Sequence, residues 1–337
     1  MKIHWLLCGG INIPSSRIHG INVHKELLNK GFNSIISHSP KFYTKDLIWR
    51  EFFIKCFLLG LSSRDVVVVQ KLEGNNTIKL LEGVCKIGAS IVLVDCDLPL
   101  KSKVAKYANI IVCPSESLAN MYRELGFQNV NVIYDAVEIF KKPIKRDIVN
   151  RKLIWFGKSG LGKWEKIMAF RKENLPLITT KWKLFTLSDH EQVDYKWDIK
   201  TFAEIISDHD LTIIPIDKSE TNLVKSANRC TQSMALGVPV LSNFIDSYAE
   251  VVQNNKNGLV SDNFEDWKEF LKKCENPEFL SELKQRAYND SLRFSIEKIV
   301  WDWIQILGLK QSKLSQREKI ENFFFFSFIM RKVASSF

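Results

Sequence analysis

The chain is 337 residues long and carries 48 lysine and arginine residues against 38 aspartate and glutamate residues, so its formal net charge is +10. This length suits roughly two domains of about 150 residues each, and a hydrophobic content of 45% is ordinary for a globular protein. The positive charge favours an anionic partner, such as nucleic acid, an anionic membrane surface or a phosphorylated small molecule. A basic protein without such a partner also fits the composition.

The seven cysteines are scattered along the chain and never form a C-x-x-C pair. Several lie in apolar segments, where a free cysteine behaves as a small hydrophobic residue, so neither a zinc site nor a disulfide framework is expected. The apolar run at residues 3–8 is too short for a signal peptide, and no run approaches the ~20 apolar residues of a membrane-spanning helix. We therefore expect a cytoplasmic protein that can bind peripherally at the inner face of the cell membrane.

Apolar runs and helical segments alternate along the first part of the chain. The run at residues 3–8 leads into Gly9 and Gly10, and the helix after the next loop is expected to stop at Gly31. The β-branched run at residues 65–70 is typical of a parallel strand covered on both faces, and the alternation predicts a parallel sheet. The expected strands are residues 3–8, 34–37, 65–70, 90–94, 110–113 and 131–134, and the expected helices include residues 45–61, 77–87 and 115–126.

A basic stretch at residues 141–152 interrupts this pattern, which then starts again. We predict an α/β fold of two Rossmann-like domains facing each other across a cleft, in which ligands bind beyond the carboxyl ends of the strands. The expected strands of the second part are residues 153–156, 182–187, 211–214, 238–241 and 258–260, and C-terminal helices are expected at residues 264–274, 278–289 and 296–307. The predicted parts are an N-terminal domain (1–140), a linker (141–152), a C-terminal domain (153–307) and a basic and aromatic tail (308–337).

Residues 225–240 predict an anion-binding site at the carboxyl edge of the second sheet. The stretch reads as a cationic loop, a short helix that ends at Gly237, and a buried strand. Helix N-termini offer free backbone N–H groups and the positive end of the helix dipole. Lys225 and Arg229 add full charges beside that helix end, and Asn228 adds an amide.

Four stretches of the chain together resemble one family. They are SSRIHG (15–20), VDCDLP (94–99), ANIIVCPSESLA (108–119) followed by VIYDAVE (132–138), and SANRCTQSMALGVPV (226–240) followed by SYAEVV (247–252) and NGLV (257–260). In order and spacing they are similar to the GT-B glycosyltransferases of the group 1 superfamily, which use nucleotide-sugar donors. The resemblance covers about residues 1–307.

The resemblance implies a hexosyltransferase-type enzyme that holds its donor mainly on the C-terminal domain and its acceptor on the N-terminal domain. It implies that no metal ion or resident cofactor is needed, because cationic side chains and helix ends neutralise the leaving diphosphate. The residues expected in catalysis are Asp97, Lys225 and Arg229. The residues expected to contact the donor are Ser16, Arg17, Gly157, Lys158, Asn228, Gln232, Tyr248 and Glu250.

Some of these residues also have simpler interpretations. Asp97, like Asp95, follows a buried strand and could act as a base on an acceptor hydroxyl, or it could cap the next helix. Lys158 and Lys163 fit solvated loop charges, and Glu250 fits the first turn of a helix. The side chains of Ser16 and Arg17 in the first loop could equally be structural.

The chain departs from the family at one motif. Many relatives carry E-x7-E, with the second glutamate bonded to the nucleotide ribose, but Val224 and Gln232 occupy these two positions here. A glutamine amide can still bond a ribose hydroxyl, whereas a valine cannot bond a sugar hydroxyl in this way. The departure leaves the donor sugar and the stereochemical outcome open, and it makes an inactive relative conceivable.

Two segments point to a membrane surface. Residues 47–59 mix aromatic residues with Arg50 and Lys55, and the aromatic run at residues 323–330 has basic residues on both sides. The second run is too short to span a bilayer and would lie in the interface. The first segment also fits an ordinary buried helix.

We therefore predict a glycosyltransferase that moves a sugar from a nucleotide-diphosphate donor to a cell-surface polysaccharide or lipid-linked acceptor. One alternative is a nucleotide-sugar epimerase of the same fold, although no clear pair of acid and base carboxylates stands out in the second half. The other is an inactive binding or scaffold protein that has kept the fold. Nucleic-acid binding has only the net charge in its favour.

Overall fold

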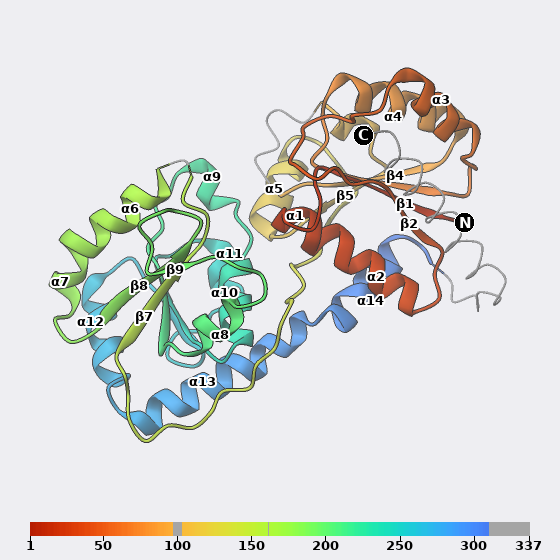
Figure 1. The fold of residues 1–337 in the computed structure, drawn as a ribbon. Coiled ribbons are helices and arrows are strands. Elements are labelled where there is room, and N and C mark those ends of the chain that lie inside the picture. The colour runs from red at the N-terminus through yellow and green to blue at the C-terminus, as the bar shows by residue number, and fades with distance from the viewer. Residues whose placement is uncertain (97–102, 161, 310–337) are drawn as a thin grey trace. The chain divides into compact units, whose positions relative to one another are not determined.

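The computed structural model describes residues 1–96, 103–160 and 162–309. The chain divides into two compact units (Figure 1), and we describe each unit by itself. The first unit contains residues 1–113, 122–133 and 296–309, and the second contains residues 114–121 and 134–295. Each unit is built around a six-stranded parallel sheet, which confirms the prediction of two Rossmann-like α/β halves.

The sheet of the first unit has the strand order β2-β1-β3-β4-β5-β6. Strands β1 and β3 are buried at every residue, because helices cover both faces of the sheet and the apolar, β-branched side chains pack on each side. The strands are β1 (Ile3–Leu7), β2 (Ser34–His38), β3 (Val66–Gln70), β4 (Ser90–Val94), β5 (Ile110–Cys113) and β6 (Val130–Val132).

A carboxylate from another loop caps helix α4 of the first unit. The carboxylate of Asp46 accepts hydrogen bonds from the backbone N–H groups of Thr77 (2.9 Å) and Asn76 (3.1 Å), and so satisfies the N-terminus of α4. The helices are α1 (Pro14–Ser16), the π-helical turn η1 (Arg17–Ile21), α2 (Asn22–Asn29), α3 (Glu51–Leu59), α4 (Asn75–Ile87), the short 3-10 helix η3 (Ala105–Tyr107), α5 (Glu116–Glu124), which continues from the second unit into the first, and α14 (Ile296–Ile306).

Helix α14 belongs to the first unit, although the sequence places residues 296–307 with the C-terminal domain. The reason is a long-range aromatic contact. Trp303 is buried, and its ring centroid lies 5.3 Å from that of Trp5 in β1. On the outer side of the same helix, Trp301 lies beneath the ammonium of Lys30, the C-cap residue of α2. The last described helix therefore completes the core of the N-terminal sheet.

The sheet of the second unit has the strand order β12-β11-β10-β7-β8-β9. Its strands are β7 (Lys152–Phe156), β8 (Lys183–Ser188), β9 (Tyr195–Lys196), β10 (Leu211–Ile214), β11 (Val240–Ser242) and β12 (Gly258–Val260). Its helices are α6 (Lys163–Ala169), η4 (Phe170–Asn174), α7 (Leu175–Ile178), α8 (Phe202–Ser207), α9 (Glu220–Leu223), α10 (Asn228–Ala235), α11 (Asp246–Ala249), α12 (Phe264–Lys273), α13 (Pro277–Ser291) and η5 (Leu292–Phe294). The sequence did not predict β9 or α9.

In each sheet the chain first adds strands on one side of its first strand and then adds the remaining strands on the other side. In the second unit the chain builds β7, β8 and β9 towards one edge and then returns to place β10, β11 and β12 on the other side of β7. The switch point therefore lies between β7 and β10, and in the first unit it lies between β1 and β3 for the same reason. Such switch points, at the carboxyl ends of the strands, are the usual ligand sites of open parallel sheets.

Candidate functional site: a cationic switch point in the second unit

The loop after β7 is held in place at Ser159 and exposes Lys158 to solvent. Both the backbone N–H and the hydroxyl of Ser159 donate to Oδ1 of Asp189 at 2.8 Å, and Asp189 follows the neighbouring strand β8. Burial raises the pKa of the Asp189 carboxyl, but the hydrogen bonds from Ser159 outweigh it and hold the pKa below its usual value. Lys158, one residue earlier, is exposed. The loop thus presents Lys158 and the backbone of Gly157 at the carboxyl edge.

The N-terminus of α10 has no side-chain cap. Its N-cap residue is Ala227, which has no side-chain acceptor, so the first backbone N–H groups of the helix are not capped from that position. The other end of α10 is closed by Gly237, as predicted. Gly237 has a φ of +69°, its N–H donates to the carbonyl of Met234, and Val238 N–H donates to the carbonyl of Ser233. The helix therefore has an N-terminus ready for an anion.

Arg229, in the first turn of α10, is held beside the loop after β7. Its Nη2 donates to the hydroxyl of Tyr248 at 3.1 Å, and Tyr248 is fully buried. A side chain built on Gly157 would bring its Cβ to 3.8 Å from Nη1 of Arg229, so the guanidinium lies close to that loop. Tyr248, which was predicted to contact the sugar donor, provides the hydroxyl that holds Arg229 in place.

Lys225 is held by a chain of polar contacts. Its Nζ donates to Oδ1 of Asn222, and Nδ2 of Asn222 donates to Oδ1 of Asp217 at 2.7 Å. The other oxygen of Asp217 forms an ion pair with Lys166 at 2.5 Å. Among the residues that the structure describes, no carboxylate forms an ion pair with Lys225 directly. The direct partner of Lys225 is the neutral amide of Asn222, so the positive charge of Lys225 is not neutralised by that contact.

The electrostatics of Lys225 confirm that cations crowd this edge. Burial, together with the nearby charges of Arg229 and Lys163, lowers the pKa of its ammonium to about 8, against the opposing effect of Asp217. A lysine whose pKa is lowered by neighbouring cations gains free energy when an anion binds between them. Lys225, Arg229 and the start of α10 therefore form a candidate anion site at the β7–β10 switch point.

Two other predicted donor contacts are engaged elsewhere. Gln232 is buried, its Oε1 accepts from the N–H of Glu138, and its Nε2 donates to the carbonyl of Ile139. The carboxylate of Glu250 accepts from the hydroxyl of Tyr134 at 2.9 Å and from the backbone N–H of Glu116. These contacts fix the segment that precedes the linker and the start of α5, so the structure gives no support to a ribose contact by Gln232.

Two of the residues predicted in the first unit, Ser16 and Arg17, lie in the segment after β1, beside the switch point of that unit. Ser16 is buried, and its hydroxyl donates to Oε1 of Gln70 at 3.2 Å, while Nη1 of buried Arg17 donates to the carbonyl of Ile11 at 2.9 Å. Both side chains therefore stabilise the loop after β1. Asp95 accepts a hydrogen bond from buried Tyr122, and Asp97 lies outside the described residues.

The residues that sequence reasoning missed are Asn222, Asp217 and Lys166, which hold Lys225. The only signal for Asp217 is its place just after strand β10, and Asn222 lies in a single-turn helix with no recognisable motif. Val224, at the position of the first family glutamate, is buried, and its carbonyl accepts from the hydroxyl of Ser115. This position is therefore part of the interior.

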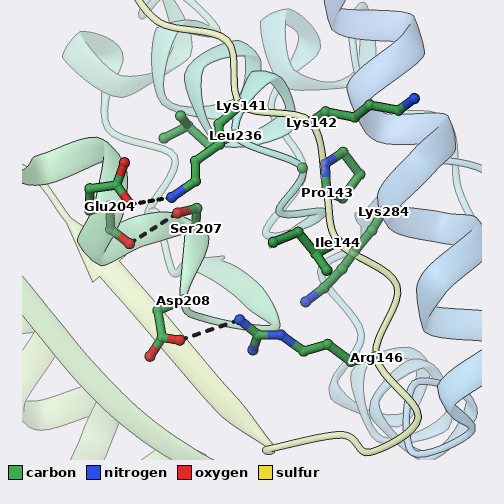
Figure 2. A pocket seen from close by; sticks show the side chains of 11 residues that line it. Lys141, Lys142, Pro143, Ile144, Arg146, Glu204, Ser207, Asp208, Leu236 and Lys284 are labelled. Carbon is green, nitrogen blue, oxygen red and sulfur yellow. Dashed lines mark hydrogen bonds and ion pairs between the residues drawn. The ribbon is translucent and has the colours of Figure 1, made fainter.

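A cavity of about 140 Å³ lies elsewhere in the second unit (Figure 2). The ion pairs around it join Lys141 to Glu204 and Arg146 to Asp208, and Asp208 also pairs with Lys152 at the start of β7. The cavity is therefore at the amino edge of the sheet, opposite the switch point. Its lining residues are Lys141, Lys142, Pro143, Ile144, Arg146, Glu204, Ser207, Asp208, Leu236, Gly237 and Lys284.

Solved structures share this architecture, although the sequence matches no family profile and no curated protein. HepE of Anabaena in complex with UDP superposes with a TM-score of 0.65 at 14% identity, over 91% of this chain and 100% of that one. The lipopolysaccharide outer core galactosyltransferase WaaB, in its apo form, gives a TM-score of 0.61 at 13% identity, over 91% and 99%.

A variant of TarM from S. aureus, in complex with fondaparinux, alpha-GlcNAc-glycerol and UDP, gives a TM-score of 0.59 at 14% identity. That match covers 75% of this chain and 58% of TarM, so the chain spans less than two thirds of the length of this relative. At such identities the likeness concerns the fold. The chain has the GT-B fold predicted from its sequence.

Proposed function

We propose that the protein is a glycosyltransferase that takes a sugar from a nucleotide-diphosphate donor. The observation that carries the proposal is the group of Lys225, Arg229 and the uncapped start of α10 at the switch point beside Gly157. A diphosphate fits this site because it offers several negative oxygens to two cations and a helix end. The similar structures support the same ligand class, since HepE was solved with UDP-glucose and the TarM variant with UDP.

In this proposal the acceptor hydroxyl attacks the anomeric carbon of the donor sugar. A new C–O bond forms, the bond from the anomeric carbon to the diphosphate oxygen breaks, and the nucleoside diphosphate leaves with the electron pair. Lys225 and Arg229 stabilise the charge that develops on the leaving oxygen, so we propose that the reaction needs no metal ion. Asp97 remains our predicted base for the acceptor proton.

We further propose that the acceptor is a cell-surface polysaccharide or a lipid-linked glycan, as part of polysaccharide biosynthesis. WaaB, which has a similar fold, is a galactosyltransferase of the lipopolysaccharide outer core. The protein would then work in the cytoplasm, bound peripherally at the inner face of the membrane. The predicted tail segment at residues 323–330 would contribute to this binding, although it lies outside the described residues.

The departure at the E-x7-E positions keeps a second function open, namely an inactive protein that binds a nucleotide sugar. The side chain of Val224 is buried, and the side-chain amide of Gln232 forms hydrogen bonds with the backbone of residues 138–139. Transfer or hydrolysis of a bound nucleotide sugar distinguishes the two: an inactive protein would show binding without any turnover.

A thermal-shift screen tests the proposed function. We expect a nucleoside diphosphate at about 100 times its Kd to add about 2.7 kcal/mol of stability, which should raise the melting temperature by roughly 2–5 °C. The shift should persist when EDTA is present, because the binding groups belong to the protein. If no nucleoside diphosphate or nucleotide sugar shifts the melting temperature, the proposed function is wrong.

The Lys225 ammonium should make this binding depend on pH. Its pKa of about 8 means that the free protein loses this proton as the pH rises through 8. Only the protonated form of Lys225 attracts a diphosphate. At a pH one unit above the pKa, about one tenth of the lysine side chains remain protonated. We expect calorimetric titration to show an affinity about tenfold lower at about pH 9 than at about pH 7.

The matched variant is Lys225→Arg, because a guanidinium stays protonated over this range. Its affinity should be nearly constant between the two pH values, even if the absolute affinity is lower. An equal fall in affinity for both proteins would show that Lys225 is not the titrating group.

A further inference from the structure

Helix α3 carries apolar side chains on two opposite faces. On its inner face Ile54 is buried, and Leu58 packs so close to α4 that a Cβ on Gly83 would lie 2.4 Å from its Cδ1. The ring of Phe57 lies on the same side, 5.1 Å from that of His4 in β1. This inner face accounts for the position of α3 beside α4 in Figure 1.

The opposite face of α3 is apolar as well and is exposed. Phe52, Cys56 and Leu59 are spaced at i, i+4 and i+7, so they line one stripe of the helix. Phe52 is 70% exposed and Leu59 is 88% exposed, and Phe53 and the preceding Ile48 are also exposed. We call these five residues the α3 surface. The sequence left a buried helix open at residues 47–59, and the structure excludes this for the outer stripe.

Several exposed apolar side chains on one face of a helix indicate a contact site, and the charges around them indicate which partner this surface fits. The carboxylate of Glu51 is neutralised by Lys55 at 3.1 Å, and that of Asp46 is used at the N-terminus of α4. Lys45 and Arg50, which lie in the segment leading into α3, are exposed. The basic charge that remains is complementary to an anionic surface.

We propose that the α3 surface docks the protein on an anionic lipid bilayer. The side chains of Phe52, Phe53 and Leu59 would enter the boundary between headgroups and acyl chains, and Lys45 and Arg50 would contact lipid phosphates. None of the helices in the described part of the chain is long and apolar enough to span a membrane. The inference extends the proposed function, because it places the enzyme at a surface that carries lipid-linked acceptors.

Charge argues against the other occupants of this surface. The C-terminal tail is itself basic, so its docking would bring like charges together. A second copy of the chain would pair two basic surfaces and meet the same repulsion. The charged residues of the tail are Lys310, Lys313, Arg317, Glu318, Lys319, Glu321, Arg331 and Lys332.

Co-sedimentation of the full-length protein with vesicles tests the proposal. We expect binding to phosphatidylcholine vesicles that contain phosphatidylglycerol, weaker binding at high salt, and little binding to phosphatidylcholine alone. The triple variant Phe52→Ser, Phe53→Ser, Leu59→Ser should reduce partitioning at least about tenfold. The control variant Ile148→Ser, Leu177→Ser removes exposed apolar side chains from the second unit and should bind like the wild type.

A second readout uses the exposed Cys56 at the centre of the stripe. An environment-sensitive dye on Cys56, with Cys85 and Cys96 replaced by serine, should shift its emission to shorter wavelength with anionic vesicles. The same dye on Leu177→Cys, in a chain that also carries Cys56→Ser, should not shift. Because UDP-induced thermal shifts are measured on the same triple variant and should persist, failure of the membrane proposal is separable from failure of the proposed function.

Four results would overturn the docking proposal. The wild type could fail to bind anionic vesicles, or the triple variant could bind them as well as the wild type does. In a full-length variant, residues 323–326 could be replaced by serine. If this variant no longer binds vesicles while the α3 triple variant still does, the membrane contact belongs to the tail. Sedimentation velocity without lipid could instead show that the triple variant converts a dimer into a monomer, which would assign the surface to a second copy.

Discussion

Replacing Arg229 by alanine is expected to weaken the binding of a nucleoside diphosphate about 100-fold, which corresponds to about 2.7 kcal/mol. The guanidinium is the group that both the Tyr248 hydrogen bond and the proximity of Gly157 place at the switch point. Its loss removes charge-assisted hydrogen bonds to the diphosphate. If the protein is an active transferase, kcat/KM should fall by about 100-fold to 1,000-fold, because the same charge stabilises the leaving group.

Two variants control this experiment. Tyr248→Phe keeps the guanidinium but removes its anchor, so the affinity should fall by only about tenfold. Lys142→Ala removes an exposed positive charge from the cavity at the opposite edge of the same unit and should leave binding unchanged. Calorimetry gives the affinities, and melting without ligand shows whether each variant is folded. A folded Arg229→Ala protein that binds within threefold of the wild type would contradict the proposed site.

Replacing Trp303 by alanine should destabilise the first unit by about 3–5 kcal/mol. This indole is 1% exposed and packs edge-on against Trp5 at the centre of the N-terminal core. Its removal opens a cavity that the helix and the strand can fill only in part. Trp301, two residues earlier on the same helix, is 48% exposed, and Trp301→Ala should cost less than about 1 kcal/mol.

Hydrogen exchange is the suitable measurement, because a chain of two units does not guarantee a single unfolding transition. The amides of β1 and β3 report the opening of the first unit, and those of β7 and β10 report the second. Trp303→Ala should accelerate exchange in β1 and β3, whereas Trp301→Ala should leave it close to that of the wild type. Equal exchange in the two variants would show that α14 does not contribute to the core of the first unit.

The sequence predicts the local part of this structure well. The β-branched run of β3 and the glycine that ends α10 are governed by neighbours in the chain, and both are found where they were expected. The predicted strand at residues 238–241 begins two residues too early, because Val238 takes part in the hydrogen bonds that close α10. This error is small and local in origin.

The remaining differences come from contacts between distant parts of the chain. Gln232 reads as a ligand contact, but its amide is used by Glu138 and Ile139, more than ninety positions earlier. Helix α14 has an ordinary amphipathic sequence, and its contacts with Trp5 and Lys30, near the other end of the chain, determine which core it joins. Lys225 is a predicted site residue, but its anchor Asn222 has no sequence signature, because it lies in a single-turn helix without a recognisable motif.

The return of α14 to the first unit has a consequence for engineering the protein. In terms of connectivity, residues 134–295 leave the first unit and come back to it, so most of the second unit behaves as an insertion within the first. A chimaera that exchanges this module with that of a relative should be cut on both sides of the insertion. A single junction at residues 141–152 would graft a foreign α14 onto β1 and break the Trp5–Trp303 contact.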